Sequence, residues 1–172
     1  MPMFDAEQIA RATALVARCT AAGIRIATAE SCTGGLIGAL LTEVPGSSAV
    51  FGYGFITYAN TAKRDVLGVP EDTLARYGAV SPETAEAMAR GALARSAATV
   101  AVAVTGVAGP GGGTDIKPVG LVHFGLALRA GECRLVERRF GDLGRSEVRR
   151  QSLLQALTLL EDGVARQDGS PP

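Results

Sequence analysis

A serine, a tyrosine and a lysine follow one another closely in the first half of the sequence, as Ser48, Tyr58 and Lys63. A lysine whose pKa is lowered by burial can take the proton of a serine hydroxyl, and a tyrosine hydroxyl can relay that proton or stabilise an oxyanion. In one interpretation of these residue types, Ser48 is a nucleophile that attacks an amide carbon, Lys63 is its base and Tyr58 is a proton relay. The alternative is a polar turn, a strand tyrosine and a surface lysine, and the spacing alone favours it because no Ser-x-x-Lys motif is present.

Residues 30–35, with the sequence Glu-Ser-Cys-Thr-Gly-Gly, form a second cluster at an expected junction between a strand and a helix. The free N–H groups of a helix start can bind an anion such as phosphate, while the carboxylate of Glu30 could face a cationic part of the same ligand. An ordinary helix cap by Ser31 or Thr33 is an equally good interpretation. Ser31 is also the second candidate for the nucleophile. The candidate binding residues of this cluster are Glu30, Thr33, Gly34 and Gly35.

The cysteines and the single histidine argue against thiol or metal chemistry. Cys19, Cys32 and Cys133 are odd in number and widely spaced, which is typical of reduced thiols. Cys32 is expected to be a small buried residue, because the only histidine, His123, lies in an apolar segment. Neither a metal site nor a cofactor is expected.

A glycine-rich loop over residues 106–118 follows the most apolar segment of the chain. A long loop of this kind is uncommon in a compact domain unless it has a function, although a plain flexible loop is the alternative. Glycines permit close approach of the backbone to a ligand, and the hydroxyl of Thr105 could hold an oxyanion. Arg145, at the start of the last expected helix, could bind a phosphate or carboxylate through two hydrogen bonds. The candidate binding residues here are Thr105, Gly106, Gly109, Gly111 and Arg145.

The elements that must position these residues alternate between helices and strands. Apolar spacing and capping residues predict helices over 5–21, 33–43, 60–67, 70–77, 81–96 and 144–164. Short apolar runs predict strands over 24–29, 50–58, 99–105, 121–128 and 133–140, the last two joined as a hairpin. This order predicts an α/β fold, a three-layer α/β/α domain with a mixed, mostly parallel sheet of about five strands.

Composition limits the classes of partner. The chain has 172 residues, no formal net charge and no tryptophan, so no nucleic-acid partner is expected. No apolar run is long enough to cross a membrane and no export signal is evident, which predicts a cytoplasmic protein without a membrane partner. We expect a single domain over 1–172 with its core at about 5–162 and a disordered tail at 165–172. The alanine-rich helix over 81–96 and the apolar strands predict a homo-oligomer.

Several blocks together resemble the C-terminal domain of the competence/damage-inducible protein CinA, a family that includes nicotinamide mononucleotide amidohydrolases. The match covers about residues 5–162, and each block alone is a weak signal. The segment Gly52-Tyr53-Gly54 and the surroundings of His123 are less typical of the family. The blocks that carry the resemblance are residues 28–35, 45–48, 58–60 with Lys63, 78–81, 105–112, 117–120 and Arg145.

The resemblance implies a three-layer fold and metal-independent hydrolysis of the carboxamide of nicotinamide mononucleotide. The products would be nicotinate mononucleotide and ammonia, in the recycling of NAD, and the partner of the chain would be this small nucleotide. Two alternatives stay open: a non-catalytic nucleotide-binding or regulatory module, and an amidohydrolase acting on a different amide. Fold alone does not choose among them.

Overall fold

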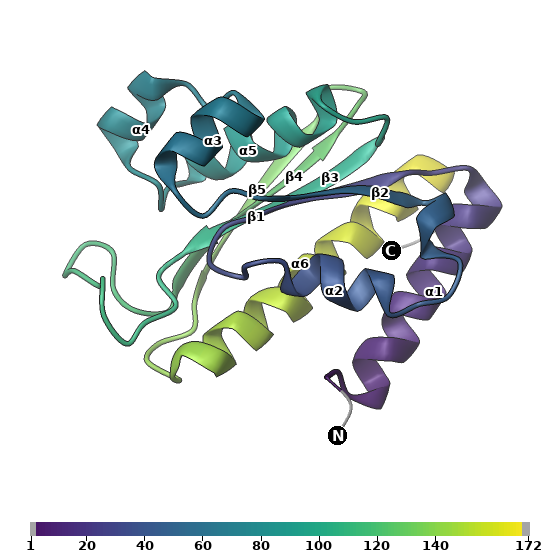
Figure 1. The fold of residues 1–172 in the computed structure, drawn as a ribbon, viewed down its shortest axis with the longest axis horizontal. Coiled ribbons are helices and arrows are strands. Elements are labelled where there is room, and N and C mark those ends of the chain that lie inside the picture. The colour runs from purple at the N-terminus through teal and green to yellow at the C-terminus, as the bar shows by residue number, and fades with distance from the viewer. Residues whose placement is uncertain (1–2, 170–172) are drawn as a thin grey trace.

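The computed structural model describes residues 3–169 as one mixed sheet between two layers of helices (Figure 1). The predicted three-layer fold is confirmed. In chain order the elements are α1 (Ala6–Ala22), β1 (Ile26–Glu30), α2 (Leu36–Thr42), the 3-10 turn η1 (Ser47–Ala49), β2 (Phe51–Ile56), α3 (Asn60–Leu67), α4 (Glu71–Tyr77), α5 (Pro82–Ala94), β3 (Val100–Gly106), β4 (Leu121–Leu128), β5 (Cys133–Arg139) and α6 (Arg145–Asp168).

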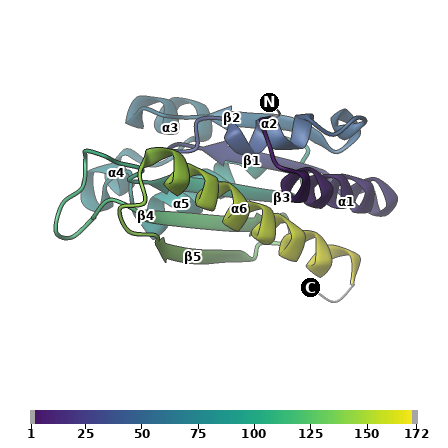
Figure 2. The ribbon, with the colours of Figure 1, turned by 90° about the horizontal axis from the view of Figure 1, so that it is seen from below.

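The sheet has the order β2-β1-β3-β4-β5 and is mostly parallel in direction. Strand β1 pairs in parallel with both β2 and β3, whereas β4 runs antiparallel to its neighbours β3 and β5. Only β4 therefore runs against the other four strands. The central strand β3 carries alternating valine and alanine and is buried, as expected for a strand covered on both faces (Figure 2).

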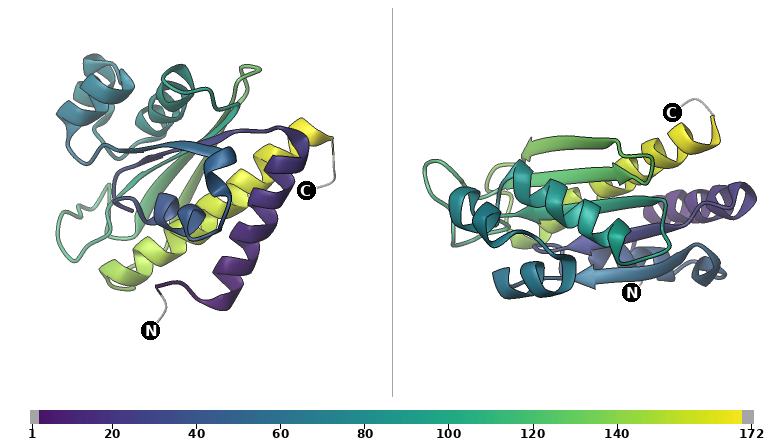
Figure 3. Two further views of the ribbon diagram at one scale, coloured as in Figure 1. Left: turned by 45° about the vertical axis from the view of Figure 1, so that its right-hand side comes forward. Right: turned by 90° about the horizontal axis from the view of Figure 1, so that it is seen from above.

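The two helical layers cover opposite faces of the sheet and bury different side chains. Helices α1, α2 and α6 cover one face of the sheet (Figure 3). The large aliphatic residues buried there include Ile26 and Val102 of the sheet and Leu153 of α6. Helix α5 packs closely on the other face over an alanine-rich cluster, with α3 and α4 against it. At Gly125 of β4 an added Cβ would lie 2.6 Å from the carbonyl oxygen of Ala85, so glycine permits this close packing.

The ends of most helices follow capping signals in the sequence. Asp5 and Gln8 form a reciprocal capping box at the start of α1, and Gly23 ends that helix in the left-handed conformation. Most boundaries lie within two residues of the predictions, and two differ by more. Helix α2 begins at Leu36 rather than at Thr33, because Gly34 and Gly35 have positive φ angles and a right-handed α-helix requires negative ones.

Helix α6 is longer than the sequence predicted. It continues to Asp168 and ends at Gly169, so residues 165–168 of the predicted disordered tail are helical. Positions 170–172 of that predicted tail lie outside the described residues.

Three connections leave the sheet at the same edge. Because β1, β2 and β3 are parallel, their carboxyl ends lie together, and the segments that follow them begin at Ser31, Thr57 and Val107. This edge is where open α/β sheets hold their ligands. Within residues 3–169, no helix has the length and apolar character needed to cross a membrane.

Candidate active site

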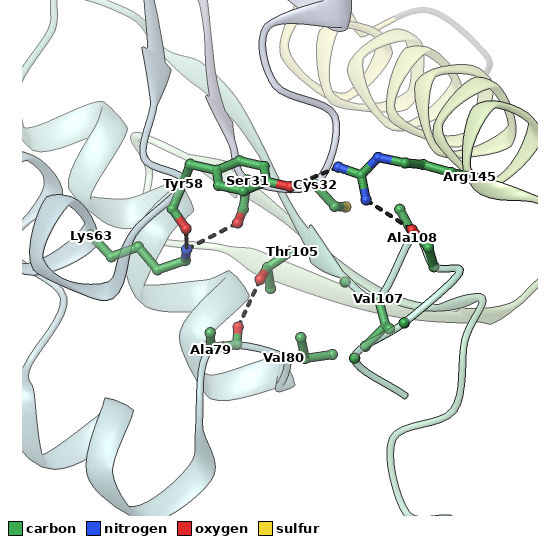
Figure 4. Close-up of a pocket in the computed structure, with 14 residues that line it drawn as sticks. Ser31, Cys32, Tyr58, Lys63, Ala79, Val80, Thr105, Val107, Ala108 and Arg145 are labelled. Atoms are coloured by element: carbon green, nitrogen blue, oxygen red, sulfur yellow. Dashed lines mark hydrogen bonds between the residues drawn. The ribbon is translucent and has the colours of Figure 1, made fainter. Parts of the chain in front are cut away.

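A cavity of about 300 Å³ opens at the carboxyl ends of β1, β2 and β3 (Figure 4). Side chains from both helical layers and from the glycine-rich loop meet there. Its lining residues are Ser31, Cys32, Tyr58, Lys63, Ala79, Val80, Thr105, Arg145 and the loop residues 106–109, 111 and 112.

The centre of the cavity is a contact between Lys63 and Ser31. Ser31 follows β1 directly, and Lys63 lies in α3, which follows the neighbouring strand β2. The Nζ atom of Lys63 lies 2.9 Å from Oγ of Ser31, 2.8 Å from the carbonyl oxygen of Thr57 and 3.3 Å from that of Tyr58. The ammonium group is thus held by one hydroxyl and two backbone carbonyls.

Lys63 is buried without a carboxylate partner. Its residue is 1% exposed, and it makes no ion pair with any described residue. Burial lowers the pKa of Lys63 below its ordinary value, because the charged form loses its hydration. A neutral lysine amine has two N–H groups and one lone pair. The two carbonyl oxygens can accept from the N–H groups, which leaves the lone pair for the proton of Ser31.

Arg145 enters the cavity from the side opposite Lys63 (Figure 4). One guanidinium nitrogen donates to the phenolic oxygen of Tyr58 at 2.7 Å, and another donates to the carbonyl oxygen of Gly109 at 2.9 Å. The arginine lies at the start of α6 and links the segment after β2 to the glycine-rich loop. Tyr58 is 59% exposed, so its ring lies at the mouth of the cavity rather than beside the amine of Lys63.

Thr105 lines the floor of the cavity at the end of β3. Its hydroxyl donates to the carbonyl oxygen of Ala79 at 2.7 Å, which holds the connection between α4 and α5 against the sheet. This bond uses the only proton of the hydroxyl, so Thr105 has no proton left to donate to a ligand. Its role is to hold Ala79 in the wall of the cavity.

The model of the CinA C-terminal domain family matches residues 8–164 of the chain. The chain belongs to the CinA C-terminal domain family. The predicted resemblance is confirmed. A CinA-like protein of Akkermansia muciniphila is 55% identical over 139 residues, which cover 81% of this chain and 33% of that protein. A putative competence-damage inducible protein of Symbiobacterium thermophilum is 63% identical over 107 residues, covering 62% of this chain and 25% of that protein. The match therefore spans about a quarter to a third of the length of these relatives.

Solved structures of CinA proteins have the same fold as this chain. The crystal structure of the competence/damage inducible protein CihA from Agrobacterium tumefaciens superposes with a TM-score of 0.92 at 51% identity, covering 94% of this chain and 98% of that chain. A CinA superfamily protein from Escherichia coli superposes with a TM-score of 0.85 at 34% identity, covering 94% and 93% of the two chains.

The structure does not bring Ser48 to Lys63, which corrects the predicted serine–lysine pair. Ser48 precedes β2 and lines a different cavity of about 330 Å³, together with Arg25 and Tyr53. Since β1 and β2 are parallel, the residue before β2 and the residue after β1 lie at opposite ends of the sheet. The five residues of β1 separate these ends by about 16 Å at the usual strand rise. In this CinA domain the lysine contacts Ser31 instead.

Residues 30–35 also differ from the prediction of an open phosphate site. The carboxylate of Glu30 accepts hydrogen bonds from the backbone N–H groups of Gly35, Ile37 and Gly38 at 3.0, 3.2 and 2.9 Å. These are the helix-start donors that a phosphate would need. Glu30 is 1% exposed and does not line the cavity, and neither do Thr33, Gly34 and Gly35. A ligand in the cavity therefore finds this helix start already occupied.

The remaining candidate residues all line the cavity that contains Ser31. They are Tyr58, Lys63, Thr105, Gly106, Gly109, Gly111 and Arg145. Cys32 lines it as well, but burial raises the pKa of its thiol to about 12, as expected for a small buried residue rather than a nucleophile.

Ala79 and Val80, between α4 and α5, line the cavity although they lie outside all of the predicted candidate clusters. They belong to one of the blocks that carry the family resemblance, and this was their only signal in the sequence. Among residues 3–169, no group of three or more His, Cys, Asp or Glu side chains is arranged to hold a metal ion.

Proposed function

We propose that this CinA domain hydrolyses the carboxamide of nicotinamide mononucleotide, with Ser31 as nucleophile and Lys63 as base. The observation that carries the proposal is the 2.9 Å contact between Oγ of Ser31 and a buried amine that has no carboxylate partner in the described part of the chain. Because burial lowers the pKa of Lys63, its neutral amine can act as a general base, and a serine beside it can attack an amide carbon.

The first half of the reaction forms an acyl-enzyme. The proton of the Ser31 hydroxyl passes to Nζ of Lys63 while Oγ bonds to the carboxamide carbon. The carbon–nitrogen bond then breaks, the leaving amino group takes the proton from Lys63, and ammonia departs. In the second half Lys63 takes a proton from water while the hydroxide adds to the ester carbon. Lys63 then returns this proton to Oγ as the bond between Oγ and the carbon breaks, which gives the acid, the free Ser31 hydroxyl and the neutral amine.

The oxyanion formed in each half needs a hydrogen-bond donor near Ser31. The N–H group of Ser31 itself donates to the carbonyl oxygen of Val104, and the hydroxyl of Thr105 donates to Ala79. The N–H group of Cys32 donates to no other described residue, and Cys32 lines the cavity. We assign the oxyanion to this N–H group, in place of the predicted Thr105, because the residue after a nucleophile often supplies such a donor.

The cavity also suits an anionic nucleotide. Its basic side chains are Lys63 and Arg145, and no carboxylate of residues 3–169 lines it. Arg145 can exchange its bonds to Tyr58 and Gly109 for the two oxygens of a phosphate, since a guanidinium binds phosphate through paired N–H groups. The exposed ring of Tyr58 offers a face for the positively charged pyridinium ring.

Ammonia release from nicotinamide mononucleotide by the purified chain tests this proposal. The wild type should release ammonia equally with and without a chelator, Ser31→Ala should lose this activity, and Ser48→Ala should keep it. Ser48→Ala is the matched control because it removes the same hydroxyl at the other end of the sheet.

Two results would contradict the proposal. Turnover by Ser31→Ala at the wild-type rate would remove Ser31 from the chemistry. Binding of the nucleotide without any release of ammonia would favour the non-catalytic module, in line with relatives that are named only for competence and damage induction.

A further inference from the structure

Glu30 is a buried carboxylate with no cationic partner among the described residues. It is 1% exposed, and both of its oxygens are used: Oε2 accepts from the N–H groups of Gly35 and Ile37, and Oε1 accepts from that of Gly38. Burying a charge is costly unless hydrogen bonds compensate it. Three backbone N–H groups offset that cost, and they join the residue before the candidate nucleophile to the start of α2.

Strand alternation sends Glu30 and Ser31 to opposite faces of the sheet. Successive residues of a strand point to opposite sides. Glu30 consequently contacts the start of α2, and Ser31 contacts Lys63 of α3 on the other side. No hydrogen bond or ion pair joins Glu30 to Lys63. The carboxylate is thus close to the reaction centre in sequence but does not contact its base.

The carboxylate closes the turn that carries Cys32. Before the turn, Ser31 is held by a hydrogen bond from its N–H group to Val104 of β3, and after the turn, α2 begins at Leu36. Between them, Gly34 and Gly35 have φ angles of +59° and +94°, a conformation that only glycine adopts easily. Three N–H groups that donate to the Glu30 carboxylate tie the far end of this turn back to the end of β1, so the chain is held on both sides of Cys32.

We infer that Glu30 is a positioning residue that holds the Cys32 N–H group at the oxyanion of the reaction. This inference rests on the proposed hydrolysis by Ser31. A donor that acts on the oxyanion stabilises the transition state and not the bound substrate. Loss of the Glu30 bonds should therefore lower kcat and leave KM nearly unchanged, and it should leave the pH dependence of kcat unchanged because Lys63 keeps its contacts.

The test compares Glu30→Gln with the wild type in steady-state hydrolysis of nicotinamide mononucleotide and in thermal unfolding. The amide of glutamine has one oxygen and adds two donors, so it cannot accept all three backbone bonds. We expect kcat to fall by about 100-fold, the usual effect of one displaced oxyanion donor, with KM within about threefold. Asp5→Ala, which removes the cap of α1 far from the cavity, is the control for lost stability and should keep kcat.

A second readout separates failure of this inference from failure of the proposed function. The rate at which a fluorophosphonate modifies Ser31, followed by mass spectrometry, requires no knowledge of the substrate. A wild type that neither reacts nor releases ammonia would overturn the proposed function, and the inference with it. A reactive wild type together with a folded Glu30→Gln that keeps kcat within about threefold would overturn the inference alone. If Glu30→Gln does not fold, Glu30→Asp, which keeps the charge but shortens the reach, takes its place with the same criterion.

Discussion

Two cavities of similar size lie at opposite ends of β1 and β2. The cavity at the carboxyl ends has about 300 Å³ and contains Ser31, Tyr58 and Lys63, and the cavity at the amino ends has about 330 Å³ and contains Ser48, Tyr53 and Arg25. Each thus combines a hydroxyl, a phenol and a cation. Their volumes and these three residue types do not distinguish them, although Arg145 and the glycine-rich loop line only the first.

The difference lies in how the cation is held. Lys63 is buried and donates to the hydroxyl of Ser31, whereas Arg25 is exposed and its side chain makes no hydrogen bond to any described residue. A buried amine can lose its proton, but a guanidinium stays charged at any physiological pH. Burial of the cation and its contact with a hydroxyl therefore distinguish the first cavity from the second.

The largest expected difference between the two ends comes from removing the cation of each. Lys63→Met keeps the length of the side chain and loses the base, so amide hydrolysis should fall by about 10³-fold, within the usual range for general bases. Arg25→Met makes a matched change at the other end and should leave the rate unchanged. Initial rates of ammonia release measure both. Equal losses of rate in the two variants would show that burial of the cation does not distinguish the two cavities.

The pH dependence of the reaction tests whether the buried cation, Lys63, acts as a base. Since burial lowers the pKa of Lys63, its neutral form becomes abundant below the ordinary lysine value of 10.5. The rate constant kcat/KM should rise about tenfold per pH unit in acid and level off at a pH below 10.5. A rate that is flat from acid to alkaline pH, or that rises only beyond that value, would contradict the role of Lys63 as a base.

Removal of the guanidinium at the cavity mouth should have an intermediate effect. Arg145→Gln loses the paired donors that we assign to the phosphate of the substrate, so KM should rise by about 10- to 100-fold, as for a hydrogen bond to a charged group. Measured kcat should change little, because Arg145 does not contact Ser31 or Lys63. Arg25→Gln serves as the control. A fall in kcat at unchanged KM would place Arg145 in the chemical step instead.

The sequence predicted the elements better than the pairing of residues across them. Helix starts such as Ser81-Pro82 and the apolar run of β3 carry local signals, so their positions followed from spacing and capping. The pairing of Ser48 with Lys63 followed from closeness along the chain. Closeness along the chain is misleading here, because Ser48 lies before β2 and Lys63 after it, at different ends of the strand.

The direction of the strands predicts the observed contact between Ser31 and Lys63. Ser31 follows β1 and Lys63 follows β2, and neighbouring parallel strands bring such segments together. The internal cap by Glu30 could not be predicted, because it depends on the turn at Gly34 and Gly35, which delays the start of α2. The sequence gives no local signal for which acceptor fills a helix start.

The smallest expected effect concerns the loop over one cavity, a feature that the other lacks. The glycine-rich loop is tied to the end of α4 by a hydrogen bond from Nζ of Lys117 to the carbonyl oxygen of Tyr77. Lys117→Met keeps the aliphatic stem and loses this bond, which is exposed and therefore contributes little. KM should rise by about threefold with kcat unchanged, because a looser loop orders itself at the expense of binding. If kcat falls instead, the glycine-rich loop must help to align Ser31. The reaction at the carboxyl ends of the strands would then depend on this loop as well as on the buried amine of Lys63.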